Sequence, residues 1–262
     1  MIIIPKKISD NEIEKFFNKK GFSNLVKQKG EELENWIDRR RHKLTHPPRL
    51  RHLYMIYQTI ILNKRTTVLE FGTGISTLVM ARALLENKKK FGPKKPFERC
   101  EFPFQLLTVD NQKKFIKISK SRISKTLKKD NNVKFFYSDV RVTMYGGNFA
   151  TEYEKLPQVN PDFIYLDGPS QWKITKTLNN FTTSQADMMP MSCDIAKFEN
   201  FLTPGTIIVS DGRTANCMFL KNNFKRNWLF KIDRESDHCY FYLQDDYLGL
   251  HNKKQLEFYK KP

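Results

Sequence analysis

Apolar residues recur at helical spacing through the first 63 positions of the chain. Ser9 and Glu12 form a capping-box pattern, and the apolar positions that follow predict a short amphipathic helix. Two further sets of apolar residues at helical spacing predict two more helices. The apolar positions are Ile13, Phe16 and Phe17 in the first helix, Leu33, Trp36 and Ile37 in the second, and Leu50, Leu53, Tyr54, Tyr57 and Ile61 in the third. Residues 1–63 are therefore expected to form a helical N-terminal extension.

From Thr66 the pattern changes to short β-branched and aromatic runs that alternate with helix-length segments. This alternation predicts a parallel sheet with helices on both faces. The expected strands are 66–71, 105–110, 133–137, 162–167 and 206–211, and the expected helices are 75–87, 111–128, 184–202 and 214–224.

The end of the chain has a different pattern. Two strand-like runs, 228–232 and 239–243, are separated by a short polar segment, which predicts an antiparallel hairpin. Segments 86–104 and 141–160 are expected to be long loops. The sequence thus predicts an α/β fold with a mainly parallel central sheet and an antiparallel C-terminal hairpin, in one domain that spans residues 64–262.

Composition narrows the class of protein. No run of about eighteen apolar residues occurs, so no membrane span is expected. The apolar start, residues 1–4, is too short for a signal peptide, and a cytoplasmic protein is expected. The four cysteines are too widely spaced for a zinc site and are expected to be reduced and buried: Cys100, Cys193, Cys217 and Cys239.

The chain is strongly basic, with 46 Lys and Arg against 28 Asp and Glu, a formal charge of +18. Such a charge favours binding to polyanions, or it reflects lysines on exposed helix faces that keep the protein soluble. The lysines lack the interleaved arginine and aromatic pattern of a nucleic-acid platform, which favours the second interpretation.

The segment TTVLEFGTGIST, residues 66–77, carries the strongest chemical signal. An apolar strand ends at Glu70, turns through Gly72 and Gly74 and enters a helix, whose first N–H groups can bind a ligand. The third glycine of a dinucleotide fingerprint is here Thr77, and the Glu70 carboxylate would repel a pyrophosphate. The same carboxylate suits the cationic methionine moiety of S-adenosylmethionine.

VLEFGTGIST resembles motif I of class I S-adenosylmethionine-dependent methyltransferases, and the strand pattern extends the resemblance to about residue 243. The resemblance implies a Rossmann-like fold and S-adenosyl-L-methionine as cofactor. It implies that Asp110, in LLTVDNQ, binds the ribose and that Asp139, in FFYSDV, contacts adenine. Each acid could instead cap a helix or bind loop N–H groups. The complete predicted cofactor site is Glu70, Gly72, Thr73, Gly74, Asp110, Asn111, Ser138, Asp139 and Asp167.

The acceptor side is expected after the fourth and fifth strands, because ligands bind at the carboxyl ends of parallel strands. Asp167 is the candidate to position or deprotonate the acceptor, unless it only caps its own turn. Arg213 is the second catalytic candidate, as a partner for an acidic group on the acceptor. The DGPS sequence at 167–170 lacks the aromatic residue typical of enzymes that methylate nucleobase amines.

The closer resemblance is to small-molecule and sugar O-methyltransferases of the catechol and macrocin type. In that group the fifth strand ends in two acids or in Asp-Asn, which bind magnesium. Here Gly212 follows Asp211, so no metal is expected.

His42, His46 and His52 lie among arginines around Pro47 and Pro48 and could supply a base or a metal ligand. The basic surroundings favour an anion-contacting or solvated face instead, and His238 is expected to be a turn residue.

The leading hypothesis is methyl transfer to an oxygen of a small-molecule or saccharide acceptor, and the basic surface favours an anionic acceptor. An RNA methyltransferase is the second hypothesis, supported by the charge but not by any added RNA-binding module. The third is a non-catalytic methyltransferase-like scaffold, because fold does not imply function.

Overall fold

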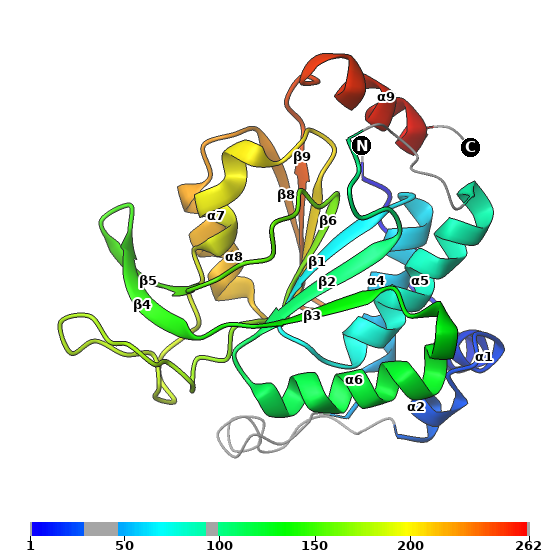
Figure 1. Ribbon diagram of the computed structural model, residues 1–262, viewed down its shortest axis with the longest axis horizontal. Helices are drawn as coiled ribbons and strands as arrows, with labels where there is room; N and C mark the ends of the chain where they lie inside the picture. Colours follow the sequence, from blue (N-terminus) through cyan, green and yellow to red (C-terminus); the bar gives the residue numbers. More distant parts are fainter. Residues whose placement is uncertain (1, 29–46, 93–98, 261–262) are drawn as a thin grey trace.

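The computed structural model describes residues 2–28, 47–92 and 99–260. One sheet of seven strands organises them, in the order β3-β2-β1-β6-β7-β9-β8 (Figure 1). The first five strands in this order run parallel to one another. Strand β9 runs antiparallel to β7, and β8 runs antiparallel to β9. In sheet order their bounds are Val133–Tyr137, Gln105–Asp110, Thr67–Phe71, Phe163–Leu166, Ile207–Asp211, His238–Leu243 and Trp228–Asp233.

This strand order confirms the predicted Rossmann-like class I methyltransferase fold. The chain moves outward from β1 through β2 to β3 and then returns to the other side of β1 to form β6 and β7. The order of the strands reverses between β1 and β6, which is where an open α/β sheet binds its ligands.

Helices cover both faces of the sheet, as the alternation of elements predicts (Figure 1). One face carries α4, α5 and α6, and the other carries α7 and α8. Alternating residues of each strand enter the two resulting hydrophobic clusters, as Val68 and Leu69 of β1 illustrate. The helices span Leu50–Leu62, Ile75–Phe91, Lys113–Leu127, Asp194–Phe198 and Thr214–Asn223.

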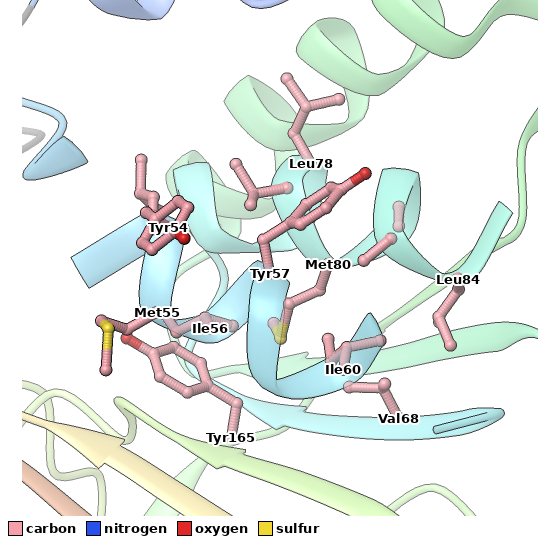
Figure 2. Packing of buried hydrophobic residues seen from close by; sticks show 14 of the residues in the cluster. Tyr54, Met55, Ile56, Tyr57, Ile60, Val68, Leu78, Met80, Leu84 and Tyr165 are labelled. Carbon is pink, nitrogen blue, oxygen red and sulfur yellow. The ribbon is translucent and has the colours of Figure 1, made fainter. Parts of the chain in front are cut away.

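The N-terminal extension packs directly on this sheet. The capping box of Ser9 and Glu12 begins α1, Asp10–Lys19, as predicted, and α2 follows at Ser23–Lys27. Helix α4 is buried along most of its length and shares one hydrophobic cluster with α5 and β1. In Figure 2, Ile60 of α4 lies close to Met80 of α5 and Val68 of β1. The helix predicted around Leu33, Trp36 and Ile37 lies outside the described residues.

Three predictions of local structure were wrong or incomplete. The expected loop at 141–160 contains a two-stranded hairpin, β4 and β5, which project from the sheet (Figure 1). The expected helix at 184–202 is reduced to α7 and a short 3-10 turn. Helix α9 was not predicted, and the Tyr259 hydroxyl anchors it by donating to Asp162 at 2.8 Å. The bounds of β4, β5 and α9 are Val140–Tyr145, Asn148–Tyr153 and Gly249–Lys260.

The four cysteines are buried and form no disulfide, as predicted. Within the described ranges, no helix combines the length and the apolar character that a membrane crossing requires.

Candidate functional site

A cavity of about 210 Å³ lies at the carboxyl ends of β1, β2, β6 and β7, beside the switch in strand order. The walls come from the glycine turn, the starts of two helices, the turns after β6 and β7, and the N-terminal extension. The lining residues are Pro47, Pro48, Arg49, His52, Leu53, Gly72, Thr73, Gly74, Ile75, Ser76, Asp110, Gln112, Phe115, Ile118, Ser119, Arg122, Tyr165, Asp167, Gly168, Ser170, Asp211, Gly212 and Arg213.

The glycine turn needs glycine for two reasons. Gly72 has a positive φ of 89°, a conformation that side chains with a Cβ avoid. A Cβ at Gly72 would also come within 2.8 Å of the backbone of Asp167 and Gly168. The turn after β1 therefore contacts the turn after β6 backbone to backbone, and together they form the floor of the cavity.

Glu70 lies beneath this turn and does not line the cavity. Its carboxylate is fully buried and accepts hydrogen bonds from the hydroxyls of Ser76 at 2.6 Å and Thr77 at 2.7 Å. Burial raises the pKa of Glu70 to about 8, although these two hydrogen bonds oppose the rise. Glu70 thus fixes the start of α5, and its link to the cavity runs through Ser76.

Asp110 reaches the same end of the cavity from β2. Its two oxygens accept from the backbone N–H of Thr73 at 2.7 Å and of Gln112 at 2.6 Å. Burial raises the pKa of Asp110 to about 7, against the effect of these bonds. The side chain connects the glycine turn to the loop after β2, so Asp110 and Glu70 both hold the segment 73–77, through different residues.

Three other predicted cofactor residues, Asn111, Ser138 and Asp139, lie outside the cavity lining. The Asn111 side chain donates to the carbonyls of Ser170 and Lys173. The Ser138 hydroxyl accepts from the Lys155 N–H, and Asp139 accepts from the Tyr137 hydroxyl at 2.6 Å. These side chains hold loops at the edge of the sheet, and their contacts with a cofactor stay predictions.

Asp167 and Arg213, the two predicted catalytic residues, both line the cavity. Arg213 is only 3% exposed, and its guanidinium donates to the carbonyl oxygens of Asp167 at 2.7 Å and Pro169 at 2.9 Å. Its Nε lies 3.7 Å from the Asp167 carboxylate. Arg213 therefore holds the turn after β6 in place, whereas the Asp167 side chain is 39% exposed and accessible to a ligand.

The histidines differ most from expectation. His52 does not lie on a solvated face; it is buried in α4, with Nδ1 2.5 Å from the Asp211 carboxylate. His238 is not a turn residue but the first residue of β9, and it is fully buried near His52. Strand pairing brings Asp211 opposite His238, a contact that no local sequence motif encodes. His42 and His46 lie outside the described residues.

Comparisons with known proteins give a fold-level likeness. No family model matches the chain, and no curated protein matches it. Among solved structures, a methyltransferase from Geobacter sulfurreducens is 9% identical, with a TM-score of 0.45 over 91% of this chain and 100% of that chain. Magnesium protoporphyrin IX methyltransferase from Synechocystis PCC 6803 with bound SAH is 8% identical, with a TM-score of 0.35 over 90% of this chain and 100% of that chain.

Human methyltransferase-like protein 13 in complex with SAH is 13% identical, with a TM-score of 0.35 over 80% of this chain and 88% of that chain. At such TM-scores these matches carry no argument about activity. The fold class rests on the strand order.

Proposed function

We propose that this protein transfers a methyl group from S-adenosylmethionine to an oxygen atom of a small-molecule or saccharide acceptor that carries negative charge. One observation carries the proposal: the Gly72–Gly74 turn and Asp110 line a single cavity at the switch point, and Arg49 of the extension lines the same cavity.

The glycine turn suits the cofactor. Gly74, Ile75 and Ser76 line the cavity at the start of α5, where backbone N–H groups can bind the methionine carboxylate. Asp110 would accept hydrogen bonds from the ribose hydroxyls. Glu70 lies one hydrogen bond behind Ser76, and the cationic part of the cofactor would favour the ionised form of this buried acid, whereas a pyrophosphate would oppose it.

The rest of the cavity suits an anionic acceptor. The cations Arg49, from the extension, and Arg122, from α6, line the cavity together with the accessible carboxylate of Asp167. In the reaction the acceptor oxygen forms a bond to the methyl carbon while the carbon–sulfur bond breaks and its electron pair stays on sulfur. The hydroxyl proton must leave the acceptor, and Asp167 is the proposed group to position the hydroxyl or take that proton.

Calorimetry tests the cofactor assignment. S-adenosylhomocysteine should bind the full-length protein with one site, and NADH should give no saturable heat. Asp110→Ala should weaken S-adenosylhomocysteine binding by about 100-fold, because the ribose loses charge-assisted hydrogen bonds. Asp110→Asn keeps one acceptor oxygen for the turn, so its affinity should lie between those of the wild type and Asp110→Ala. Asp246 is exposed and lies outside the cavity, so Asp246→Ala should bind like the wild type. Saturable binding of NADH alone would reject the proposal.

Transfer of tritium from methyl-labelled S-adenosylmethionine into cell extract tests the acceptor class. Label is expected in the small-molecule fraction, as alkali-stable ethers that bind to an anion-exchange resin. Label in the RNA fraction would favour the RNA methyltransferase hypothesis instead. Cofactor binding without transfer to any fraction would favour the non-catalytic scaffold.

A further inference from the structure

Three side chains from distant parts of the chain meet at the acceptor end of the cavity. His52 comes from α4, Asp211 ends β7 and His238 begins β9. Each offers one nitrogen or oxygen atom, and these atoms all lie within 4.8 Å of one another. Asp211 and His238 are paired across the two strands, so the register of the sheet sets them side by side.

One atom of this trio is a buried orphan. Among the described residues, His238 Nε2 is a buried atom without a hydrogen-bond partner. It faces His52 Nδ1 and Asp211 Oδ1, which lie 2.5 Å apart as an ion pair. Buried polar groups are nearly always paired, so an orphaned nitrogen beside this pair indicates a ligand that all three side chains could share.

The remaining contacts prepare the trio for a metal ion. Ser236 Oγ lies 3.0 Å from Nδ1 of His238, which leaves Nε2 to face the trio. This matches the second-shell hydrogen bond that orients histidine ligands of metals. Two imidazoles and one carboxylate are a donor set for zinc and other divalent transition metals, not for magnesium, which prefers oxygen.

We infer that His52, Asp211 and His238 form a binding site for one divalent transition-metal ion of the zinc class. His238 lies behind the site and is fully buried, whereas His52 and Asp211 line the cavity. The open coordination position therefore faces the acceptor, as in zinc sites with three protein ligands. The magnesium site that the sequence argues against involved Asp167 and Asp211, so this is a different site.

Arg49 competes with the ion. One guanidinium nitrogen lies 2.7 Å from His52 Nε2, and another lies 3.6 Å from the Asp211 carboxylate. An arginine N–H that points at Nε2 keeps the proton of the ring on Nδ1, the atom that would bind the metal. The Arg49 side chain is 45% exposed and can turn toward solvent. Metal binding should accordingly displace both that proton and Arg49.

The consequence for catalysis rests on the proposed function. A metal-bound hydroxyl loses its proton far more readily than a free one, since zinc lowers the pKa of a bound water to about 7. An acceptor hydroxyl in the open position would thus become a better nucleophile for the methyl carbon. Its proton would leave to solvent or to Asp167.

The test is titration of the chelator-treated, full-length protein with Co²⁺ and Zn²⁺, followed by visible absorption and calorimetry. The wild type should bind one ion, and Co²⁺ should give the strong visible bands of a low-coordinate nitrogen and oxygen site. His52→Ala, Asp211→Asn and His238→Gln should each weaken binding by about 100-fold. Arg49→Ala should tighten it by about 10-fold, because a competing cation is removed. His251→Ala, in α9, should bind like the wild type.

Circular dichroism melts identify variants that fail to fold. Arg49 is partly exposed, so Arg49→Ala remains informative even if the variants of the three buried ligands fail to fold. Absence of stoichiometric binding by the wild type would overturn the inference, and so would binding that Arg49→Ala and the folded ligand variants leave unchanged. S-adenosylhomocysteine affinity is measured in parallel without metal. If S-adenosylhomocysteine does not bind, the proposed function is rejected while the metal site stands.

Discussion

Alanine at position 72 is expected to destabilise the protein by about 3 kcal/mol or more. The new Cβ would have to occupy a backbone conformation with a φ of 89° and would meet the Asp167 carbonyl and the Gly168 nitrogen at 2.8 Å. Neither contact is a flexible side chain, so the two turns must separate. Urea unfolding of Gly72→Ala should show a lower midpoint, and the folded fraction should bind S-adenosylhomocysteine weakly.

Two other glycines serve as matched controls. Gly92 also has a positive φ, of 92°, but a Cβ there would meet nothing within 4 Å, so Gly92→Ala measures the backbone cost alone. A Cβ at Gly74 would meet its nearest atom, Ser76 Oγ, at 3.5 Å, so Gly74→Ala should keep its stability. If Gly72→Ala loses no more stability than Gly92→Ala, the close approach of the two turns is wrong.

Stability should fall as the pH rises from about 5 to about 8.5. Burial raises the pKa of Glu70 from 4.5 to about 8, so the folded state holds this proton more tightly than the unfolded state does. The stabilisation is complete below the unfolded pKa and is lost as the pH rises through the folded one. At 1.36 kcal/mol per pKa unit, Glu70 accounts for up to about 5 kcal/mol.

Urea unfolding of the wild type and of Glu70→Gln across this pH range measures the effect. Burial also raises the pKa values of Asp110 and Asp194 to about 7, so only the difference between the two proteins isolates Glu70. The variant should show the flatter dependence, and Glu257→Gln, an exposed residue of α9, should follow the wild type. Equal slopes for wild type and Glu70→Gln would mean that Glu70 is ionised in the fold throughout.

The parallel sheet could be predicted because each strand is a short apolar run, a signal contained in a few neighbouring residues. The β4–β5 hairpin carried a local signal too, since Gly146 and Gly147 both have positive φ and separate two alternating runs. The length of segment 141–160 favoured the interpretation as a loop, so the hairpin was not predicted. The helix expected at 184–202 failed for a tertiary reason, because the Gln171 side chain donates to the carbonyls of residues 183, 185 and 188 and holds that segment in an irregular path.

The same division applies to the site. Gly72, Gly74 and Asp110 could be found because each follows directly from a strand and its turn. The contact of His52 with Asp211 and His238 could not, because it depends on how α4 docks and on the register of β7 with β9. Sequence patterns describe faces of elements, and they do not describe which faces of distant elements meet.

The position of these residues along the chain has a consequence for biosynthesis. The glycine turn, Asp110 and β6 are all complete before the last strands leave the ribosome, whereas the trio of His52, Asp211 and His238 needs β9. Because β9 inserts between β7 and β8, the last strand to be made brings His238 to the two residues that α4 and β7 supply. A nascent chain should consequently complete the glycine turn and Asp110 before it assembles the trio that could bind a metal ion.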